Sequence, residues 1–235
     1  MRDPTLQKKL LTWFRKHKRP LPWRETKNWY HIWISEVMLQ QTQVETVIPY
    51  YKRFIEKFRT VEELADASQQ EVLKIWEGLG YYSRARNLHQ AAKSIVSDYR
   101  SQIPRDRQEL LKIPGFGPYT TNAVLSIAFN KPFAVMDGNV KRVLSRLFAI
   151  RDDIRQLKTQ QSIQALMDNL LPLNLPSEFN EAMMELGATI CKSSIPLCSD
   201  CPLLQNCQAY KKNLVTILPY KSPSHPIPLK QSLAC

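Results

Sequence analysis

Four cysteines crowd together near the end of the chain, and they are its clearest chemical signal. They stand at Cys191, Cys198, Cys201 and Cys207, in the spacing Cys-x6-Cys-x2-Cys-x5-Cys. Four thiolates so close in sequence can close one tetrahedral sulfur site, and the compact loop needs a metal to order it. Structural zinc usually draws on two close cysteine pairs, whereas only Cys198 and Cys201 are spaced that way. The residues predict a metal site and leave the metal undecided.

A second group of residues could bind phosphate at a turn between two helices. The run Pro114-Gly115-Phe116-Gly117-Pro118 precedes an apolar helical stretch. Its glycines would let backbone N–H groups point outward at a helix N-terminus, which suits a phosphate and reads no base sequence. A plain helix–helix turn could use the same residues, so this motif alone is weak.

Two acidic residues stand where a helix could present them to a cleft. Asp137 and Gly138 open a helical stretch, so Asp137 is either a simple N-cap or a carboxylate aimed into a cleft. Glu36 lies within the apolar stretch from Trp33 to Leu39. Taken alone, Glu36 would be read as a solvated helix carboxylate.

The elements that must position these residues are predicted to be helices. Apolar residues recur with a helical period nearly throughout, and no convincing period of two indicates a strand. We therefore expect an all-α fold of about ten helices with short loops. Capping-box patterns mark three helix starts: Thr60 with Glu63, Ser68 with Glu71, and Asp106 with Glu109.

Composition narrows the class of protein. The chain has 235 residues, 43% of them hydrophobic, and a formal net charge of +12. This favours a packed domain with a polyanionic partner, either nucleic acid or an anionic membrane surface. No apolar run reaches the ~18 residues of a membrane span, and the N-terminus does not resemble a signal peptide, so an intracellular, cytoplasmic location is expected. The basic run Arg15, Lys16, Lys18 and Arg19 is interpreted as a solvated face.

Taken together, these motifs resemble those of the helix-hairpin-helix DNA glycosylase superfamily, and within it the MutY family of adenine glycosylases. The resemblance runs from about Leu11 to Ala209. Further blocks that carry it are Leu21-Pro22-Trp23-Arg24, Trp33-Ile34-Ser35-Glu36, Gly78-Leu79-Gly80-Tyr81-Tyr82-Ser83-Arg84, and Phe179-Asn180-Glu181-Ala182-Met183-Met184-Glu185-Leu186-Gly187. The cysteine spacing is also that of the family's [4Fe–4S] cluster, which the resemblance therefore implies as cofactor.

The resemblance implies two helical lobes around a catalytic cleft. Residues 29–132 would form a six-helix barrel lobe that contains the helix-hairpin-helix. Residues 1–28 and 133–211 would form the iron–sulfur lobe, and residues 212–235, which are rich in proline, would be a tail or linker.

The resemblance also assigns the chemistry of base removal. Cleaving an N-glycosidic bond calls for one acid to protonate the base and one carboxylate to stabilise the sugar cation. Glu36 would be the acid and later the base that activates water, Asp137 would face C1′, and Asn139 would brace both. Position 119 carries a Schiff-base lysine in the endonuclease III branch. Tyr119 cannot form that bond, so a monofunctional glycosylase is expected.

The remaining site residues are implied in the same way. Residues that would line the adenine pocket are Arg24, Leu39, Tyr119 and Glu181. Gln41 and Tyr81 would wedge into the base stack that adenine leaves. The DNA backbone would be contacted at Gly115, Gly117, Lys141 and Arg142.

The expected partner is double-stranded DNA with adenine opposite 8-oxoguanine or guanine, bound by a monomer without a membrane. MutY proteins usually continue into a C-terminal domain that recognises 8-oxoguanine, which this chain would lack, so a weakened preference for 8-oxoguanine is expected. Two alternatives stay open. The chain could be a mismatch thymine or uracil glycosylase, although the thymine-excising relative lacks a glutamate at position 36. It could also be a non-catalytic DNA-binding module.

Overall fold

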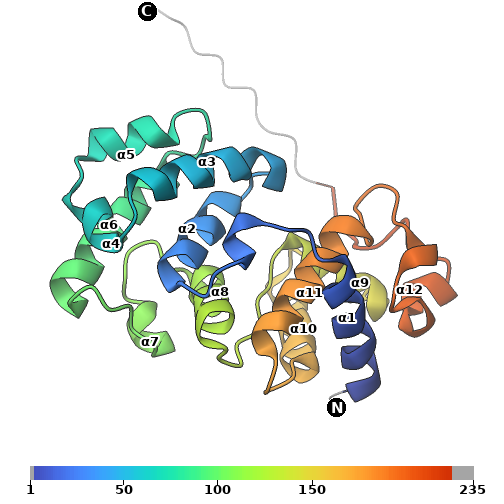
Figure 1. The fold of residues 1–235 in the computed structure, drawn as a ribbon. Coiled ribbons are helices and arrows are strands. Elements are labelled where there is room, and N and C mark those ends of the chain that lie inside the picture. Colours follow the sequence, from blue (N-terminus) through green and yellow to red (C-terminus); the bar gives the residue numbers. More distant parts are fainter. Residues whose placement is uncertain (1–2, 224–235) are drawn as a thin grey trace, which may run out of the picture.

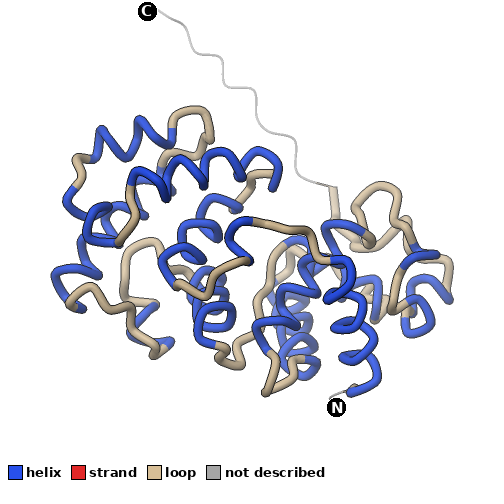
Figure 2. Tube along the Cα trace, viewed as in Figure 1, coloured by secondary structure: helices blue, strands red, loops and turns tan. Residues whose placement is uncertain are grey.

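A computed structural model describes residues 3–223, and every regular element in that range is a helix (Figures 1 and 2). The prediction of an all-α fold is confirmed, with twelve α-helices and three short 3-10 helices where about ten helices were expected. The α-helices are α1 (Pro4–His17), α2 (Trp29–Leu39), α3 (Val44–Lys57), α4 (Val61–Asp66), α5 (Gln69–Trp76), α6 (Ser83–Tyr99), α7 (Arg107–Leu110), α8 (Pro118–Phe129), α9 (Gly138–Leu147), α10 (Leu157–Leu170), α11 (Pro176–Thr189) and α12 (Gln208–Lys211). The 3-10 helices are η1 (Pro22–Arg24), η2 (Cys198–Asp200) and η3 (Leu204–Asn206).

The helices bury two main hydrophobic cores. The first is built from α2 to α8 around side chains such as Phe54 and Trp76. The second is built from α1 and α9 to α11 around side chains such as Leu10 and Phe179, with Leu203 from the segment after α11. Figure 1 shows α3 to α7 on one side, α1 and α9 to α12 on the other, and α2 and α8 between them. The chain thus returns to its N-terminal helix, because α1 completes the core of the C-terminal helices.

The segment between α1 and α2 crosses from one core to the other. Leu21 and Trp23 are buried in the first core, although residues 1–28 were assigned to the iron–sulfur lobe. Trp23 of η1 therefore packs in the first core, while Arg24 of η1 contacts Glu185 of α11. The lobe boundary at residue 28 stays a prediction.

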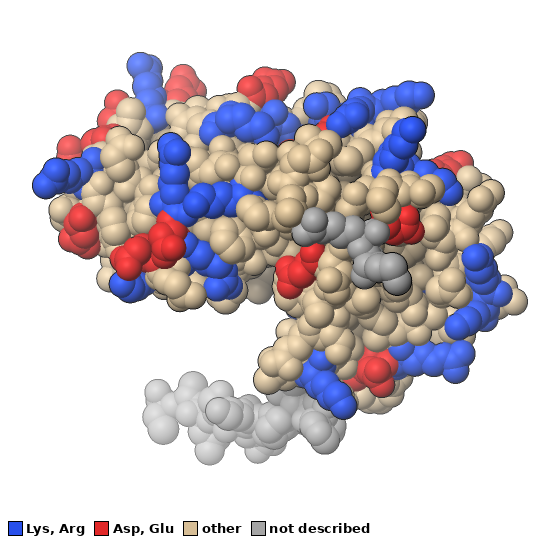
Figure 3. All heavy atoms as spheres, turned by 90° about the horizontal axis from the view of Figure 1, so that it is seen from below, with Lys and Arg blue, Asp and Glu red and all other residues tan. Residues whose placement is uncertain are grey.

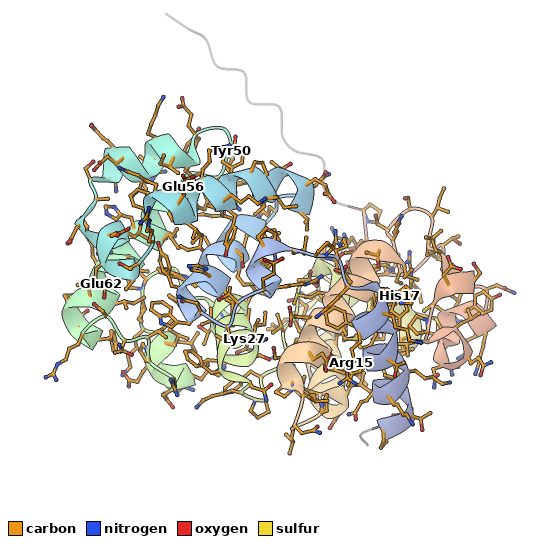
Figure 4. The ribbon with its side chains drawn as sticks, viewed as in Figure 1. Arg15, His17, Lys27, Tyr50, Glu56 and Glu62 are labelled. Carbon is orange, nitrogen blue, oxygen red and sulfur yellow. The ribbon has the colours of Figure 1, made fainter. Side chains whose placement is uncertain are left out.

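Helix α11 lies at the junction of the two cores and packs against α1, α8 and α9. Its Asn180 donates hydrogen bonds of 2.7 Å to Ser126 Oγ on α8 and 2.9 Å to the Phe133 carbonyl. Lys27, which Figure 4 labels near the centre of the molecule, donates from Nζ to Ser177 Oγ at 3.1 Å. These contacts join α11 to α8 and to the segment before α2. Asn180 is fully buried, where an unpaired polar group would be costly.

The three helix starts marked by capping patterns are confirmed. Ser68 and Glu71 form a reciprocal capping box at α5. Thr60 caps α4 by accepting the Glu63 N–H, but the Glu63 carboxylate accepts the Arg59 N–H rather than that of Thr60. Asp106 accepts the Glu109 N–H at α7. Side-chain oxygens satisfy the free N–H groups of a first turn in each case.

Part of the predicted tail packs on the C-terminal core. Leu218 is buried, and its carbonyl accepts a hydrogen bond of 2.8 Å from Arg146 Nε. The Ile154 N–H donates to the Tyr220 carbonyl, and Ser222 contacts Asp153. Residues 218–222 therefore pack against the C-terminal core, while residues 224–235 of the predicted tail lie outside the described residues. The assignment of residues 212–235 as a tail or linker stays a prediction.

The surface carries charges of both signs. Figure 3 shows Lys and Arg side chains spread over one face, with Asp and Glu among them. Within residues 3–223, no helix combines the length and the apolar character needed to cross a membrane.

Candidate active site

A cavity of about 740 Å³ opens between the two cores, a size in the usual range for small-molecule sites. Its walls come from η1, α2, the turn after α2, α8, α9 and α11. Predicted site residues that line it are Arg24, Glu36, Leu39, Gln41, Tyr119, Asp137, Asn139, Arg142 and Glu181. Tyr81, Gly115, Gly117 and Lys141 are not in this wall. The fold thus brings together residues that are up to 157 positions apart (Arg24 and Glu181).

Glu36 is a buried carboxyl on an otherwise apolar helix. Neighbours on α2 such as Trp33 and Met38 are buried with it, and Trp33 stacks on Phe116 of the hairpin turn. Burial raises the pKa of Glu36 to about 7, and the nearby carboxyls of Asp137 and Glu181 act in the same direction. Hydrogen bonding from Tyr119 and the charge of Arg24 oppose this rise. Glu36 can therefore hold or release a proton near neutrality, unlike a solvated helix carboxylate.

Tyr119 holds Glu36 from the first turn of α8. Its hydroxyl donates a hydrogen bond of 2.6 Å to Glu36 Oε2. Burial and the neighbouring carboxyls raise the pKa of Tyr119 well above its usual value, so the phenol stays protonated. It therefore acts as a neutral donor that orients the carboxyl.

Asp137 is both an N-cap and a residue of the cavity wall. One carboxylate oxygen accepts the Val140 N–H at 2.7 Å, and the other accepts Asn139 Nδ2 at 2.8 Å. Burial raises the pKa of Asp137, and these two hydrogen bonds work against the rise by favouring the charged form. The sequence left open whether Asp137 is an N-cap or a carboxylate aimed into a cleft. The two interpretations are compatible, because the same side chain caps α9 and lines the cavity.

Behind Asp137, Asn139 is held from the other side by Arg142. Arg142 Nη2 donates to Asn139 Oδ1 at 2.8 Å and to the Gly187 carbonyl at 2.9 Å, and Nε donates to the Cys191 carbonyl at 2.8 Å. Gly187 has no room for a side chain, since a Cβ there would lie 2.5 Å from Asn139 Cβ. Arg142 was expected to contact DNA. Its Nε and Nη2 are engaged inside the protein, and the expected contact stays a prediction, as it does for Lys141.

The opposite wall is a network of charges that sequence reasoning found only in part. Arg24 lies 3.5 Å from Glu181 and donates to Glu185 at 2.9 Å. Arg19 donates to Glu185 as well, and both Arg19 and Glu185 line the cavity. The interpretation of Arg19 as part of a solvated face is therefore wrong. The four-residue spacing of Glu181 and Glu185 among apolar residues of one helix was the available signal.

The two residues expected to wedge into DNA lie on adjacent turns. Gln41 and Tyr81 have left-handed backbones, with φ of 57° and 49°, and Tyr81 is 58% exposed. Buried Arg84 joins the turns by donating to the Met38 carbonyl at 2.8 Å, at the end of α2, and to the Gly80 carbonyl at 3.3 Å. The Arg84 guanidinium thus links the turn that carries Gln41 to the turn that carries Tyr81.

The predicted hairpin lies between α7 and α8. Gly115 needs to be glycine, because its φ is +82° and a Cβ would lie 3.2 Å from Asn87 Cβ. Gly117 caps α8 with an ordinary φ of −74° and open space around it. The backbone conformation at position 117 therefore does not require glycine.

The four clustered cysteines are free thiols on one side of α9. Burial raises the pKa values of Cys198, Cys201 and Cys207, and the charge of other cysteines in the group raises them further, so these thiols lie within range of one another's charge. Arg146 Nη1 lies 3.4 Å from Cys191 Sγ. Across residues 3–223 no group of three His, Cys, Asp or Glu side chains is arranged to hold a single metal ion. Four cysteine thiols are the ligand set of an iron–sulfur cluster as well as of a single zinc ion, whose bonds to sulfur are about 2.3 Å long.

Solved structures place this fold in a known class. The chain superposes with a TM-score of 0.79 on a thermostable thymine-DNA glycosylase, at 31% identity over 88% of this chain and 95% of that one. It superposes with a TM-score of 0.74 on endonuclease III in a non-covalent DNA complex, at 29% identity over 88% and 94% of the two chains. The class is that of the endonuclease III-like, all-helical fold.

Sequence comparison narrows the class to one family. Residues 34–169 match the HhH-GPD superfamily of base excision DNA repair proteins, and the chain belongs to that superfamily. It is 44% identical to an adenine DNA glycosylase of Mus musculus over 86% of this chain and 41% of the mouse protein. It is 40% identical to one of Buchnera aphidicola subsp. Baizongia pistaciae over 93% of this chain and 62% of that protein. The chain thus spans less than two thirds of either relative.

Proposed function

We propose that this chain is an adenine DNA glycosylase of base excision repair, which hydrolyses adenine mispaired with 8-oxoguanine or guanine in duplex DNA. The observation that carries the proposal is the pair of carboxyls in one cavity, Glu36 with a pKa of about 7 and Asp137 at the start of α9. The similarity to adenine DNA glycosylases over most of the chain supports adenine as the base.

In the proposed reaction the two carboxyls have different protonation states. Protonated Glu36 gives its proton to the departing adenine and then, as carboxylate, takes a proton from the attacking water. Asp137 is ionised and stabilises the positive sugar. Its hydrogen bonds to Val140 N–H and Asn139 favour that charge, and a neutral Glu36 spares it a like-charged neighbour. Because Tyr119 has no amine, the enzyme leaves an intact abasic site.

The other residues would bind and open the DNA. Arg24, Leu39 and Glu181 would contact the extruded adenine from the cavity wall, beside Tyr119. Gln41 and exposed Tyr81 would fill the space that the adenine leaves in the stack. The hairpin at Gly115 and Gly117, with Lys141, would contact phosphates.

A panel of duplexes tests the base and the reaction type. Duplexes with A:8-oxoG, A:G, A:C, T:G and U:G pairs are incubated with the protein and divided into samples with and without hot alkali. Strand breaks are expected mainly from the A:8-oxoG and A:G duplexes, and only after alkali. Breaks mainly from T:G or U:G would identify a pyrimidine mismatch glycosylase. Breaks without alkali would contradict the monofunctional reaction, and binding without base release would indicate a non-catalytic module.

We further propose that Cys191, Cys198, Cys201 and Cys207 hold a [4Fe–4S] cluster. The ligand type fits it, since such a cluster is held by four cysteine thiolates, and Cys201 lies within range of the charge of the other three. The cluster would order the loop of residues 191–207, which carries the four cysteines. It would also hold the Cys191 carbonyl in place, and with it the Arg142 side chain that contacts Asn139.

Replacing Cys198 by Ala is expected to remove the iron and to expose residues 191–207 to proteolysis, because the loop has little apolar core of its own. Purified parent protein should contain about four irons per chain, as in a [4Fe–4S] centre. Ser199→Ala, in the same loop, is the control and should keep its iron. A parent protein with stoichiometric zinc and no iron would contradict the assignment.

A further inference from the structure

Glu185 is a buried carboxylate whose oxygens are all occupied by arginine donors. It lies on α11 and is 1% exposed. Oε1 accepts the backbone N–H of Arg19 at 3.0 Å and its Nε at 2.9 Å. Oε2 accepts Arg19 Nη2 at 3.0 Å and Arg24 Nη2 at 2.9 Å. Hydrogen bonds and charge from the two arginines hold the pKa of Glu185 at about 2 despite its burial, so it is ionised at every working pH.

This carboxylate organises a segment that has no regular structure to hold it. Residues 18–21 connect α1 to η1, and Arg24 ends η1. Arg24 donates to the Arg19 carbonyl at 3.2 Å and lies over the Phe14 ring at 5.4 Å. With its Nη2 bound to Glu185, its Nε is left 3.5 Å from Glu181 at the cavity wall. The position of Arg24 therefore depends on α11 more than on its own helix.

The placement of Arg24 matters for the charge on Glu36. The groups that face Glu36 are Tyr119 from α8, Asp137 from the start of α9, Glu181 from α11 and Arg24 from η1. Of these, Arg24 alone is positive. An arginine released from Glu185 would find its nearest counter-ions among Glu181, Asp137 and Glu36, because a buried cation needs a partner.

We propose that Glu185 is a positioning residue, which holds Arg24 and Arg19 at the base-binding wall so that neither cation pairs with Glu36 or Asp137. That this wall binds the base rests on the proposed function. Glu185 itself would touch neither base nor sugar, and it acts through Arg24.

Glu185→Gln tests this role, since glutamine keeps the size of the side chain and removes its charge. Single-turnover base release from the A:G duplex is measured as a function of pH. We expect the basic limb of the profile to move about one unit toward lower pH, because an opposite charge at close range favours ionised Glu36 by at least that much. The rate at pH 7 should fall about fivefold with that shift, because the protonated fraction drops from about one half to about one tenth. Glu178→Gln on the same helix, which breaks the ion pair with Arg15, should leave the profile in place.

Two further variants keep the test decisive. Glu185→Gln combined with Arg24→Gln lacks the released arginine that faces Glu36 and keeps only Arg19, so its basic limb should lie at higher pH than that of Glu185→Gln. If Glu185→Gln does not fold, Arg24→Gln alone should move the limb above that of the parent. A limb that stays at the parent position in Glu185→Gln, or in Arg24→Gln, would overturn the proposal.

A direct titration separates this inference from the proposed function. The ¹³C shift of the Glu36 carboxyl can be followed with pH in parent and variants without any substrate. A lower midpoint in Glu185→Gln supports the positioning role even if every duplex is left intact. An unchanged midpoint rejects it even if adenine is released.

Discussion

Glu36→Gln should slow base release from an A:G duplex by roughly 10²–10⁴-fold at pH 7, the range expected for loss of a general acid. Glutamine fits the same pocket and can still accept the Tyr119 hydroxyl, but it has no proton to give. Duplex affinity should therefore change little. Single-turnover kinetics and a gel-shift titration measure the two quantities separately.

The matched control is Glu56→Gln, an exposed glutamate that Figure 4 labels on α3 and that does not line the cavity. It should keep the parent rate. A Glu36→Gln variant as fast as this control would show that the proton comes from elsewhere and would remove the basis of the proposed reaction.

The raised pKa of Glu36 also predicts how rate and stability depend on pH. The rate of the parent should fall as pH rises through about 7, because the acid loses its proton there. The folded pKa lies above the ordinary value of 4.5, so the stabilising contribution is complete below pH 4.5 and is lost as pH rises through 7. Glu36→Gln has no ionisable group at this position and does not lose stability in this way. The melting temperature of the variant minus that of the parent should therefore increase from pH 4.5 to pH 7, as differential scanning calorimetry can measure.

Asp137→Asn should reduce the rate by roughly 10²–10³-fold, the usual effect of removing one preorganised electrostatic contact to a transition state. Asparagine caps helices about as well as aspartate, so α9 should still begin at Gly138 and stability should change little. The loss would then come from the charge that faces the sugar cation. Single-turnover kinetics and thermal melting, measured on one preparation, separate the two effects.

Asp106→Asn, at the N-cap of α7, is the control for the capping effect alone. It should melt like Asp137→Asn and release base like the parent. If Asp137→Asn keeps the parent rate, Asp137 is a cap and nothing more. If instead Asp137→Asn fails to fold, the start of α9 depends on the charge of Asp137 as well as on its hydrogen bond.

Local patterns in the sequence predicted the elements well. The caps at Thr60, Ser68 and Asp106 begin helices as expected, because a cap needs only residues three positions apart. Contacts between distant segments were predicted less well. Arg19 was interpreted as a surface charge because its partner Glu185 lies 166 positions away. The contacts of Arg142 with the Gly187 and Cys191 carbonyls were not predicted either, because both carbonyls lie more than forty positions away.

The sequence by itself determined the all-helical fold and a set of residue types suited to base removal, since periodicity, caps and motif spacing are local properties of the chain. Tertiary structure alone decided the protonation of Glu36. Packing α2 against α8 removes that carboxyl from water, and the approach of η1, α9 and α11 sets the charges around it. The pKa of a carboxyl depends on its desolvation and on its neighbours in space, and its neighbours in sequence determine neither.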